Sequence, residues 1–178
     1  MHLDDAAGSA QDAVKQGPMS LTSSIEGERP LRLYAYWNER RGDREFPSRA
    51  DIDPLQFKYA LGSVSLVECL GDPPRFRYRV VSSSLTLTLG YEMTGRCTEE
   101  IPEPDVRAYV EALYQRAIDA RKPLYEAGTA MLDGRRWHYR SLVLPLSSDG
   151  VVIDMLLVYR EAAAVTPSPD PNPRYRDP

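Results

Sequence analysis

Two Asp-Gly steps, at 133–134 and 149–150, divide the last part of the chain into three β-rich segments. The segments are Leu124–Leu132, Arg136–Leu146 and Val151–Arg160. Asp-Gly favours the tight turn that joins neighbouring antiparallel strands. The pattern therefore predicts a meander of three antiparallel strands.

Two more strands and a long helix are predicted upstream. Val64–Leu70 is rich in β-forming residues, and Arg75–Ser82 alternates arginine with apolar side chains after a turn at 71–74. This alternation is typical of a hairpin with one apolar face. Between 104 and 123, apolar residues recur at helical spacing from Pro104, which can start a helix, to Pro123, which ends it.

The chain also opens its folded part with a short helix. Pro30 suits a first helical turn, and Leu33, Tyr36 and Trp37 fall on one stripe of the segment 31–41. A second short helix is predicted from Pro54, and short helical turns over 83–101. We therefore expect an α+β fold: one five-stranded antiparallel sheet with helices on one side, and an N-terminal amphipathic helix on the other side or at an edge.

Composition limits the cellular setting. The 178 residues hold 22 basic and 26 acidic side chains, a net charge of −4, which argues against a general polyanion-coating protein. The acidic N-terminus does not resemble a secretory signal, and the two cysteines, Cys69 and Cys97, fit a reducing compartment. We expect a cytoplasmic protein with no membrane insertion.

Three regions are expected along the chain. Residues 1–29 lack a sustained apolar period and predict a flexible leader, whereas residues 161–178 crowd five prolines together and predict a disordered tail. Residues 30–160 form the domain.

Four stretches of this domain resemble a bacterial PAS-like family, and so does the order of predicted elements. They are Tyr36–Gly42 with Pro47–Pro54, Arg75–Val81, Leu144–Gly150 and Val152–Leu157. The resemblance implies a sensory or docking role in signalling rather than a reaction. It also implies a regulatory protein as partner in trans, and a homodimer that pairs through the stripe Leu33, Tyr36 and Trp37.

A small-molecule pocket, where PAS domains form one, would lie between the sheet and the long helix. The residues expected to face it are Tyr78, Val80, Val110, Leu113, Tyr114, Met131, Trp137 and Tyr139. Core packing explains the same residues equally well, and no specific ligand follows.

The cofactor stays unknown, but neither haem nor a flavin adduct is indicated. The residues around Cys97 lack the Asn-Cys-Arg motif of light-sensing flavin domains, and the helix from 105 to 122 has no histidine for haem. His2 and His138 lie far apart without clustered carboxylates, so we predict no metal site.

Two further functions stay open. A carrier or cone-fold enzyme would use the interior, with Glu68 or Asp154 as acid or base only if either faces inward. Nucleic-acid binding would use two adjacent basic rows on one sheet face, formed by residues 75, 77 and 79 and by residues 136, 138 and 140. Pairing of these arginines with acids such as Glu68 and Glu126 is the simpler expectation.

Overall fold

The computed structural model describes residues 21–132 and 135–164, without the side chains of 130–132, 135 and 164. The elements in order are α1 (Leu21–Ser24), α2 (Glu28–Arg41), η1 (Arg49–Asp51), η2 (Pro54–Ser63), β1 (Val64–Leu70), β2 (Arg75–Val80), α3 (Ser83–Leu89), η3 (Thr98–Glu100), α4 (Pro104–Ala120), β3 (Leu124–Leu132), β4 (Arg135–Leu146) and β5 (Met155–Ala164). The turn expected at 133–134 lies outside the described residues.

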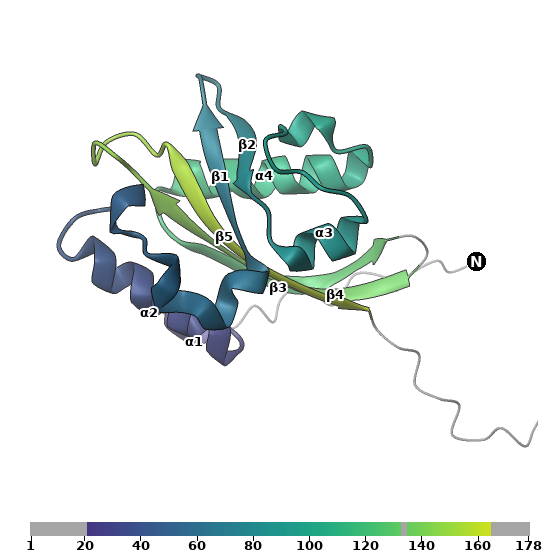
Figure 1. Cartoon of the computed structure of the whole chain (residues 1–178), viewed down its shortest axis with the longest axis horizontal. Helices are drawn as coiled ribbons and strands as arrows, with labels where there is room; N and C mark the ends of the chain where they lie inside the picture. Colours follow the sequence, from purple (N-terminus) through teal and green to yellow (C-terminus); the bar gives the residue numbers. More distant parts are fainter. Residues whose placement is uncertain (1–20, 133–134, 165–178) are drawn as a thin grey trace, which may run out of the picture.

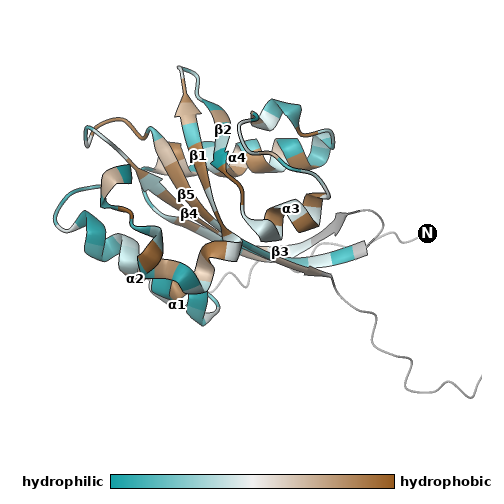
Figure 2. Ribbon diagram, in the orientation of Figure 1, coloured by the Kyte–Doolittle hydropathy of each residue, from teal (hydrophilic) through white to brown (hydrophobic). Residues whose placement is uncertain are grey.

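The five strands form one antiparallel sheet in the order β2-β1-β5-β4-β3. Helices α3 and α4 lie on one side of it, and α1 and α2 on the other (Figure 1). The predicted α+β fold is therefore confirmed. Figure 2 shows hydrophobic residues along β1 and β5, which lie in the middle of the sheet with strands on both sides.

Domain boundaries differ from those expected. Residues 21–24 and 28–29, placed in the leader, belong to α1 and α2, and Ile25 between them is buried. At the other end, β5 extends to Ala164, four residues beyond the predicted boundary at 160. The flexibility expected for 1–20 and 165–178 lies outside the described residues.

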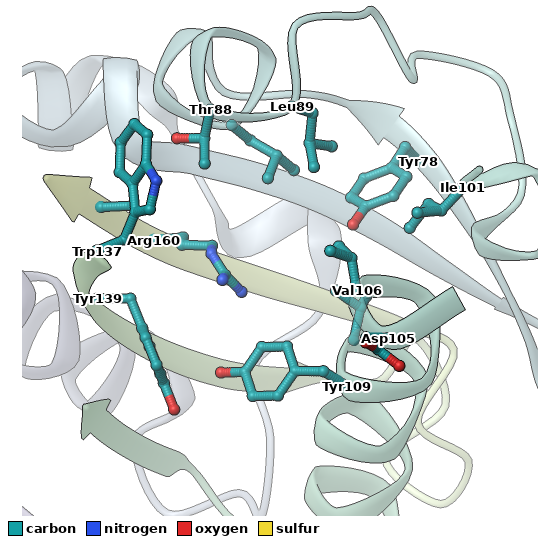
Figure 3. A pocket seen from close by; sticks show the side chains of 13 residues that line it. Tyr78, Thr88, Leu89, Ile101, Asp105, Val106, Tyr109, Trp137, Tyr139 and Arg160 are labelled. Atoms are coloured by element: carbon teal, nitrogen blue, oxygen red, sulfur yellow. The ribbon is translucent and has the colours of Figure 1, made fainter. Parts of the chain in front are cut away.

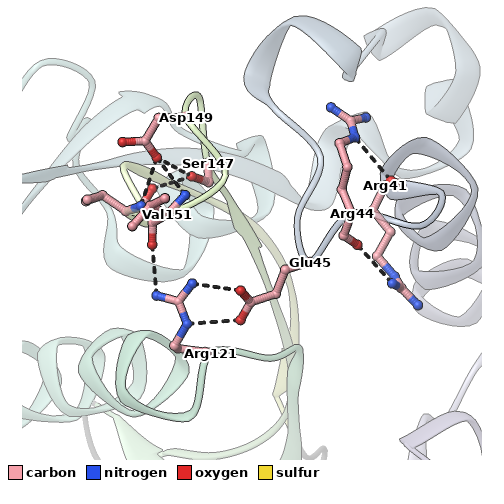
Figure 4. Close-up of polar contacts among 8 residues, drawn as sticks. Arg41, Arg44, Glu45, Arg121, Ser147, Asp149 and Val151 are labelled. Atoms are coloured by element: carbon pink, nitrogen blue, oxygen red, sulfur yellow. Dashed lines mark hydrogen bonds and ion pairs between the residues drawn. The ribbon is translucent and has the colours of Figure 1, made fainter.

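Strand β5 begins four residues later than predicted because the preceding turn holds Val151 and Val152. The Asp149 carboxylate accepts hydrogen bonds from both of their backbone N–H groups at 2.8 Å, and from the Ser147 hydroxyl at 3.0 Å (Figure 4). These bonds lower the pKa of Asp149 and keep the two valines exposed.

Helix α2 is held against the sheet by the apolar stripe that the sequence predicts. Leu33, Tyr36 and Trp37 are all buried, and the Trp37 indole N–H donates to the backbone oxygen of Pro145 in β4 at 2.9 Å. The apolar stripe is therefore buried by contacts within one chain. The expectation that these three residues form a homodimer contact is wrong, because in this fold they have no surface left to offer a second copy.

Arg121 ties the end of α4 to two loops of the opposite layer. Its guanidinium donates twice to Glu45 at 2.9 Å and once to the Val151 backbone oxygen at 2.9 Å (Figure 4). It also lies over the ring of Phe46, 5.0 Å from the centroid. This contact closes one end of the sandwich formed by the helices and the sheet.

Candidate functional site

A cavity of about 190 Å³ lies between the sheet and the helices α3 and α4 (Figure 3). The strands contribute Tyr78, Trp137, Tyr139, Arg160 and Ala162 to its wall. Helices and loops contribute a mostly apolar remainder, in which Leu85, Leu89, Ile101, Val106 and Val110 are the hydrophobic members. The volume is enough for a small organic molecule but not for a large cofactor, since typical drug-sized sites run from about 300 Å³ upward.

Strand alternation explains which side chains reach the cavity. Tyr139 pairs with Ala162, and both side chains face the cavity, as does Trp137 two residues earlier. Gly128 on β3 lies opposite Tyr139, and a Cβ built there would meet the Tyr139 hydroxyl at 3.0 Å. Glycine at this position therefore makes room for the Tyr139 ring.

Four of the eight predicted pocket residues line the cavity: Tyr78, Val110, Trp137 and Tyr139. Leu113 and Tyr114 are buried beside them but do not reach the wall. Met131 lies in β3, and its side chain is outside the described residues.

Val80 does not face the cavity, and this prediction is wrong. Its side chain is 51% exposed. The reason is a β-bulge: Val67 pairs with Tyr78 and Leu66 with Val80, so β2 carries one extra residue at that step. An extra residue breaks the two-residue alternation, and Val80 turns to the outside.

The Tyr78 and Tyr114 hydroxyls form a buried hydrogen bond of 3.1 Å beside the cavity. Tyr114 also meets Phe76 edge-on, with ring centroids 5.3 Å apart. Burial raises the pKa of both hydroxyls, and the positive charge of Arg160 opposes the shift at each of them. Both tyrosines are therefore neutral at physiological pH, and each satisfies the other.

Tyr109 forms a second polar contact, on the side of the cavity near β3. Its hydroxyl donates to the Glu126 carboxylate, which Arg116 also contacts at 2.5 Å. Burial and this hydrogen bond raise the pKa of Tyr109, while Arg160 opposes the shift. Glu126 is thus engaged by two residues of α4, and neither belongs to the basic rows with which the sequence predicted it to pair.

Arg160 is one of the cavity residues that the pattern of the sequence did not predict. The sequence pattern predicts a strand that ends at residue 160, where a charged side chain is ordinary. In the structure β5 continues past it, and Arg160 points inward between Tyr109, Tyr139 and Trp137 (Figure 3). The signal that could have found it is spacing: Leu156, Val158, Arg160 and Ala162 alternate along one face.

The two basic rows are not adjacent, which corrects that expectation. Strands β1 and β5 lie between β2 and β4. On β2, Arg77 and Arg79 contact Glu68 at 2.6 and 3.3 Å, and Arg75 contacts Glu99 at 2.6 Å. On β4, Arg140 lies within 4 Å of Glu26 and Glu161. The continuous basic surface that nucleic-acid binding required is therefore not formed by these residues.

The acids considered for catalysis do not face the cavity. Glu68 binds the arginines of β2, and Asp154 accepts hydrogen bonds from the backbone N–H and the hydroxyl of Ser148. Burial, aided by Asp154, raises the pKa of the Cys69 thiol to about 12, so it is a poor nucleophile. Cys97 directly precedes η3, and neither cysteine lines the cavity.

Metal ligands do not cluster in the described part of the chain, where no group of three or more histidine, cysteine, aspartate or glutamate residues could hold an ion. Within the same residues, no helix is both long and apolar enough to cross a membrane.

Comparison with known families identifies the fold. A family model described as a PAS domain matches residues 27–158. The chain belongs to the PAS domain family. PAS domains are generally sensory modules rather than catalytic ones, so a sensory role is the function that this membership supports. The PAS-like resemblance of the sequence is confirmed at this level.

Two solved structures are similar to this PAS domain. One is the PAS domain of BvgS from Bordetella pertussis, with 18% identity over 65% of this chain and 89% of that one, and a TM-score of 0.47. The other is a sensory box sensor histidine kinase from Vibrio cholerae, with 13% identity over 64% of this chain and 91% of that one, and a TM-score of 0.44. No curated protein sequence matches.

Proposed function

We propose that this PAS domain is a bacterial, cytoplasmic sensory module that binds a small molecule in its interior and acts through a separate regulatory protein. The observation that carries the proposal is the cavity of about 190 Å³ between α4 and the sheet. Its wall combines apolar side chains with a few polar ones, which is the usual character of a ligand site. A molecule bound in the cavity would also contact helices α3 and α4, which form the layer above the sheet.

Occupancy of the cavity is tested by native mass spectrometry of the full chain, purified without dialysis. We expect the wild-type protein to carry a defined added mass. Ala162→Phe fills the cavity from β5 and is expected to abolish that mass. Ala163→Phe is the matched control, because residue 163 is exposed and does not line the cavity, and it is expected to keep the mass.

A wild-type spectrum without added mass under several growth conditions would contradict ligand binding. So would an added mass that both phenylalanine variants retain equally. Far-ultraviolet circular dichroism of the two variants checks separately that neither substitution changes the fold.

We also propose a homodimer, through a surface other than α2. Leu61 and Val80 are both exposed, and both line a small hollow between η2 and the sheet. Apolar side chains that remain exposed together favour an interface, and a second copy can pair the same patch across a two-fold axis.

Sedimentation equilibrium at micromolar concentration tests this surface. The wild type is expected to show twice the chain mass, and Leu61→Asp combined with Val80→Asp is expected to show the mass of one chain. Leu87→Asp is the control, because Leu87 is 82% exposed on α3 and does not line that hollow. A monomeric wild type, or a dimer that survives the double substitution, would contradict the interface.

The regulatory partner is tested by affinity capture from the native lysate. We expect a signalling or regulatory protein to be recovered by the wild type and in different yield by Ala162→Phe. Recovery of no such protein under any growth condition would contradict action in trans.

A further inference from the structure

Arg160 places a positive charge on the inward face of the sheet, where its neighbours are apolar. Leu156 and Val158 precede it on the same face of β5 and are buried, and Ala162 follows it in the cavity wall. Its guanidinium lies over two aromatic rings, 5.2 Å from the centroid of Tyr109 and 5.5 Å from that of Tyr139 (Figure 3). These rings supply part of the stabilisation that a half-buried cation needs.

No carboxylate of the described residues lies within ion-pair distance of Arg160. Glu126, on the nearby strand β3, is bound by Tyr109 and Arg116. Asp105 lines the cavity too, but it is exposed in the first turn of α4, where a negative charge is favoured by the helix dipole. Arg160 is half-buried, and a partly desolvated charge is unfavourable without a counter-charge, so the fold leaves a cation that an anion can neutralise.

Unpaired hydrogen-bond donors in the cavity wall also favour an anionic ligand. The Arg160 Nε and Trp137 Nε1 atoms are buried, and neither donates to an acceptor among the described residues. Both side chains line the cavity, and both are donors only. Burying a donor without an acceptor is unfavourable, so the group that completes this site accepts hydrogen bonds.

We propose that the ligand is a small organic carboxylate with an apolar body, bound so that its charged end meets Arg160 and Trp137. A single guanidinium matches one carboxylate in a two-point contact. The apolar body fits the rest of the wall, where Leu85, Leu89, Val106 and Val110 surround a volume of about 190 Å³. This inference rests on the proposed function, because it names the chemical class that the cavity would sense.

The test is isothermal titration of the full chain with benzoate and hexanoate, each compared with its uncharged amide. We expect a carboxylate to bind saturably and its amide to bind at least tenfold more weakly. Arg160→Leu is expected to weaken carboxylate binding roughly 10- to 100-fold, as for the loss of a hydrogen bond to a charged group. Arg140→Leu is the matched control, since Arg140 lies on the opposite face of the sheet, and it is expected to leave the affinity unchanged.

Two more measurements separate a binding role of Arg160 from a structural one. If Arg160 serves a ligand rather than the fold, Arg160→Leu raises the urea midpoint of the unliganded protein, because it replaces an unpaired, half-buried cation by an apolar side chain. Asp105→Asn is expected to strengthen carboxylate binding, because it removes the acid from the cavity wall.

Equal binding of acid and amide, or unchanged affinity in Arg160→Leu, would overturn the carboxylate assignment. The assignment would also be overturned if neither acid binds saturably and the mass carried by the wild-type protein belongs to a compound that is not an acid. In that case the added mass would still support a ligand-binding cavity if Ala162→Phe removed it. If neither acid binds and no added mass is found, both the carboxylate and the cavity function fail.

Discussion

Replacing Trp37 by alanine is expected to lower the free energy of unfolding by about 3–5 kcal/mol, the usual range for deleting a large buried aromatic side chain. Trp37 is 2% exposed between α2 and the sheet, and its indole N–H satisfies the Pro145 backbone oxygen. Tyr34 stacks on it with ring centroids 6.4 Å apart. The substitution removes all three contacts, and urea unfolding followed by circular dichroism measures the loss.

Two controls show whether the loss comes from this packing. Trp37→Phe keeps an aromatic ring but not the indole N–H, so it is expected to cost less than Trp37→Ala and more than a surface change. Glu39→Ala, on the exposed side of α2, is expected to change stability by no more than about 0.5 kcal/mol. A Trp37→Ala loss as small as that of Glu39→Ala would mean that α2 does not dock as described.

The stripe on α2 illustrates what periodicity can and cannot predict. Spacing identified Leu33, Tyr36 and Trp37 as one apolar face, and that face is buried. Spacing does not name the surface that covers it, because a sheet of the same chain and a second copy bury the same side chains equally well. The long-range bond from Trp37 to Pro145, 108 residues away, decides between them.

The cavity shows the same limit on the sheet side. Alternation on β4 correctly separated Trp137 and Tyr139 from the exposed Arg136 and His138. It failed at Val80, because one bulge residue reverses the side to which the next side chain points. Such a bulge depends on how β1 and β2 pair, which no local pattern in β2 records.

Arg160 was missed for a different reason. A charged residue after a run of apolar ones is a reasonable end for a strand, and β5 was expected to stop there. The pairing of β5 with β4 instead continues from Arg160 to Ala164. A local departure from the apolar pattern at an inward position is where a functional site is expected, and here it marks the wall of the cavity.

The second large effect on stability is expected at the hydrogen-bonded hydroxyls of Tyr78 and Tyr114, beside the cavity. Tyr114→Phe is expected to cost about 1–3 kcal/mol of stability, because it leaves the buried Tyr78 hydroxyl without its partner at 3.1 Å. Tyr78→Phe is expected to cost a similar amount for the same reason.

The double variant, Tyr78→Phe with Tyr114→Phe, removes both hydroxyls at once and leaves no unpaired group. Its loss of stability is therefore expected to be smaller than the sum of the two single losses, with a coupling of about 0.5–3 kcal/mol from urea unfolding of the four proteins. Additive losses would mean that the two hydroxyls do not depend on each other. Because Phe keeps the ring of Tyr78 in the cavity wall, the double variant is also expected to retain the added mass that Ala162→Phe loses. That combination would separate the polar contact that stabilises this wall from the space that holds the ligand.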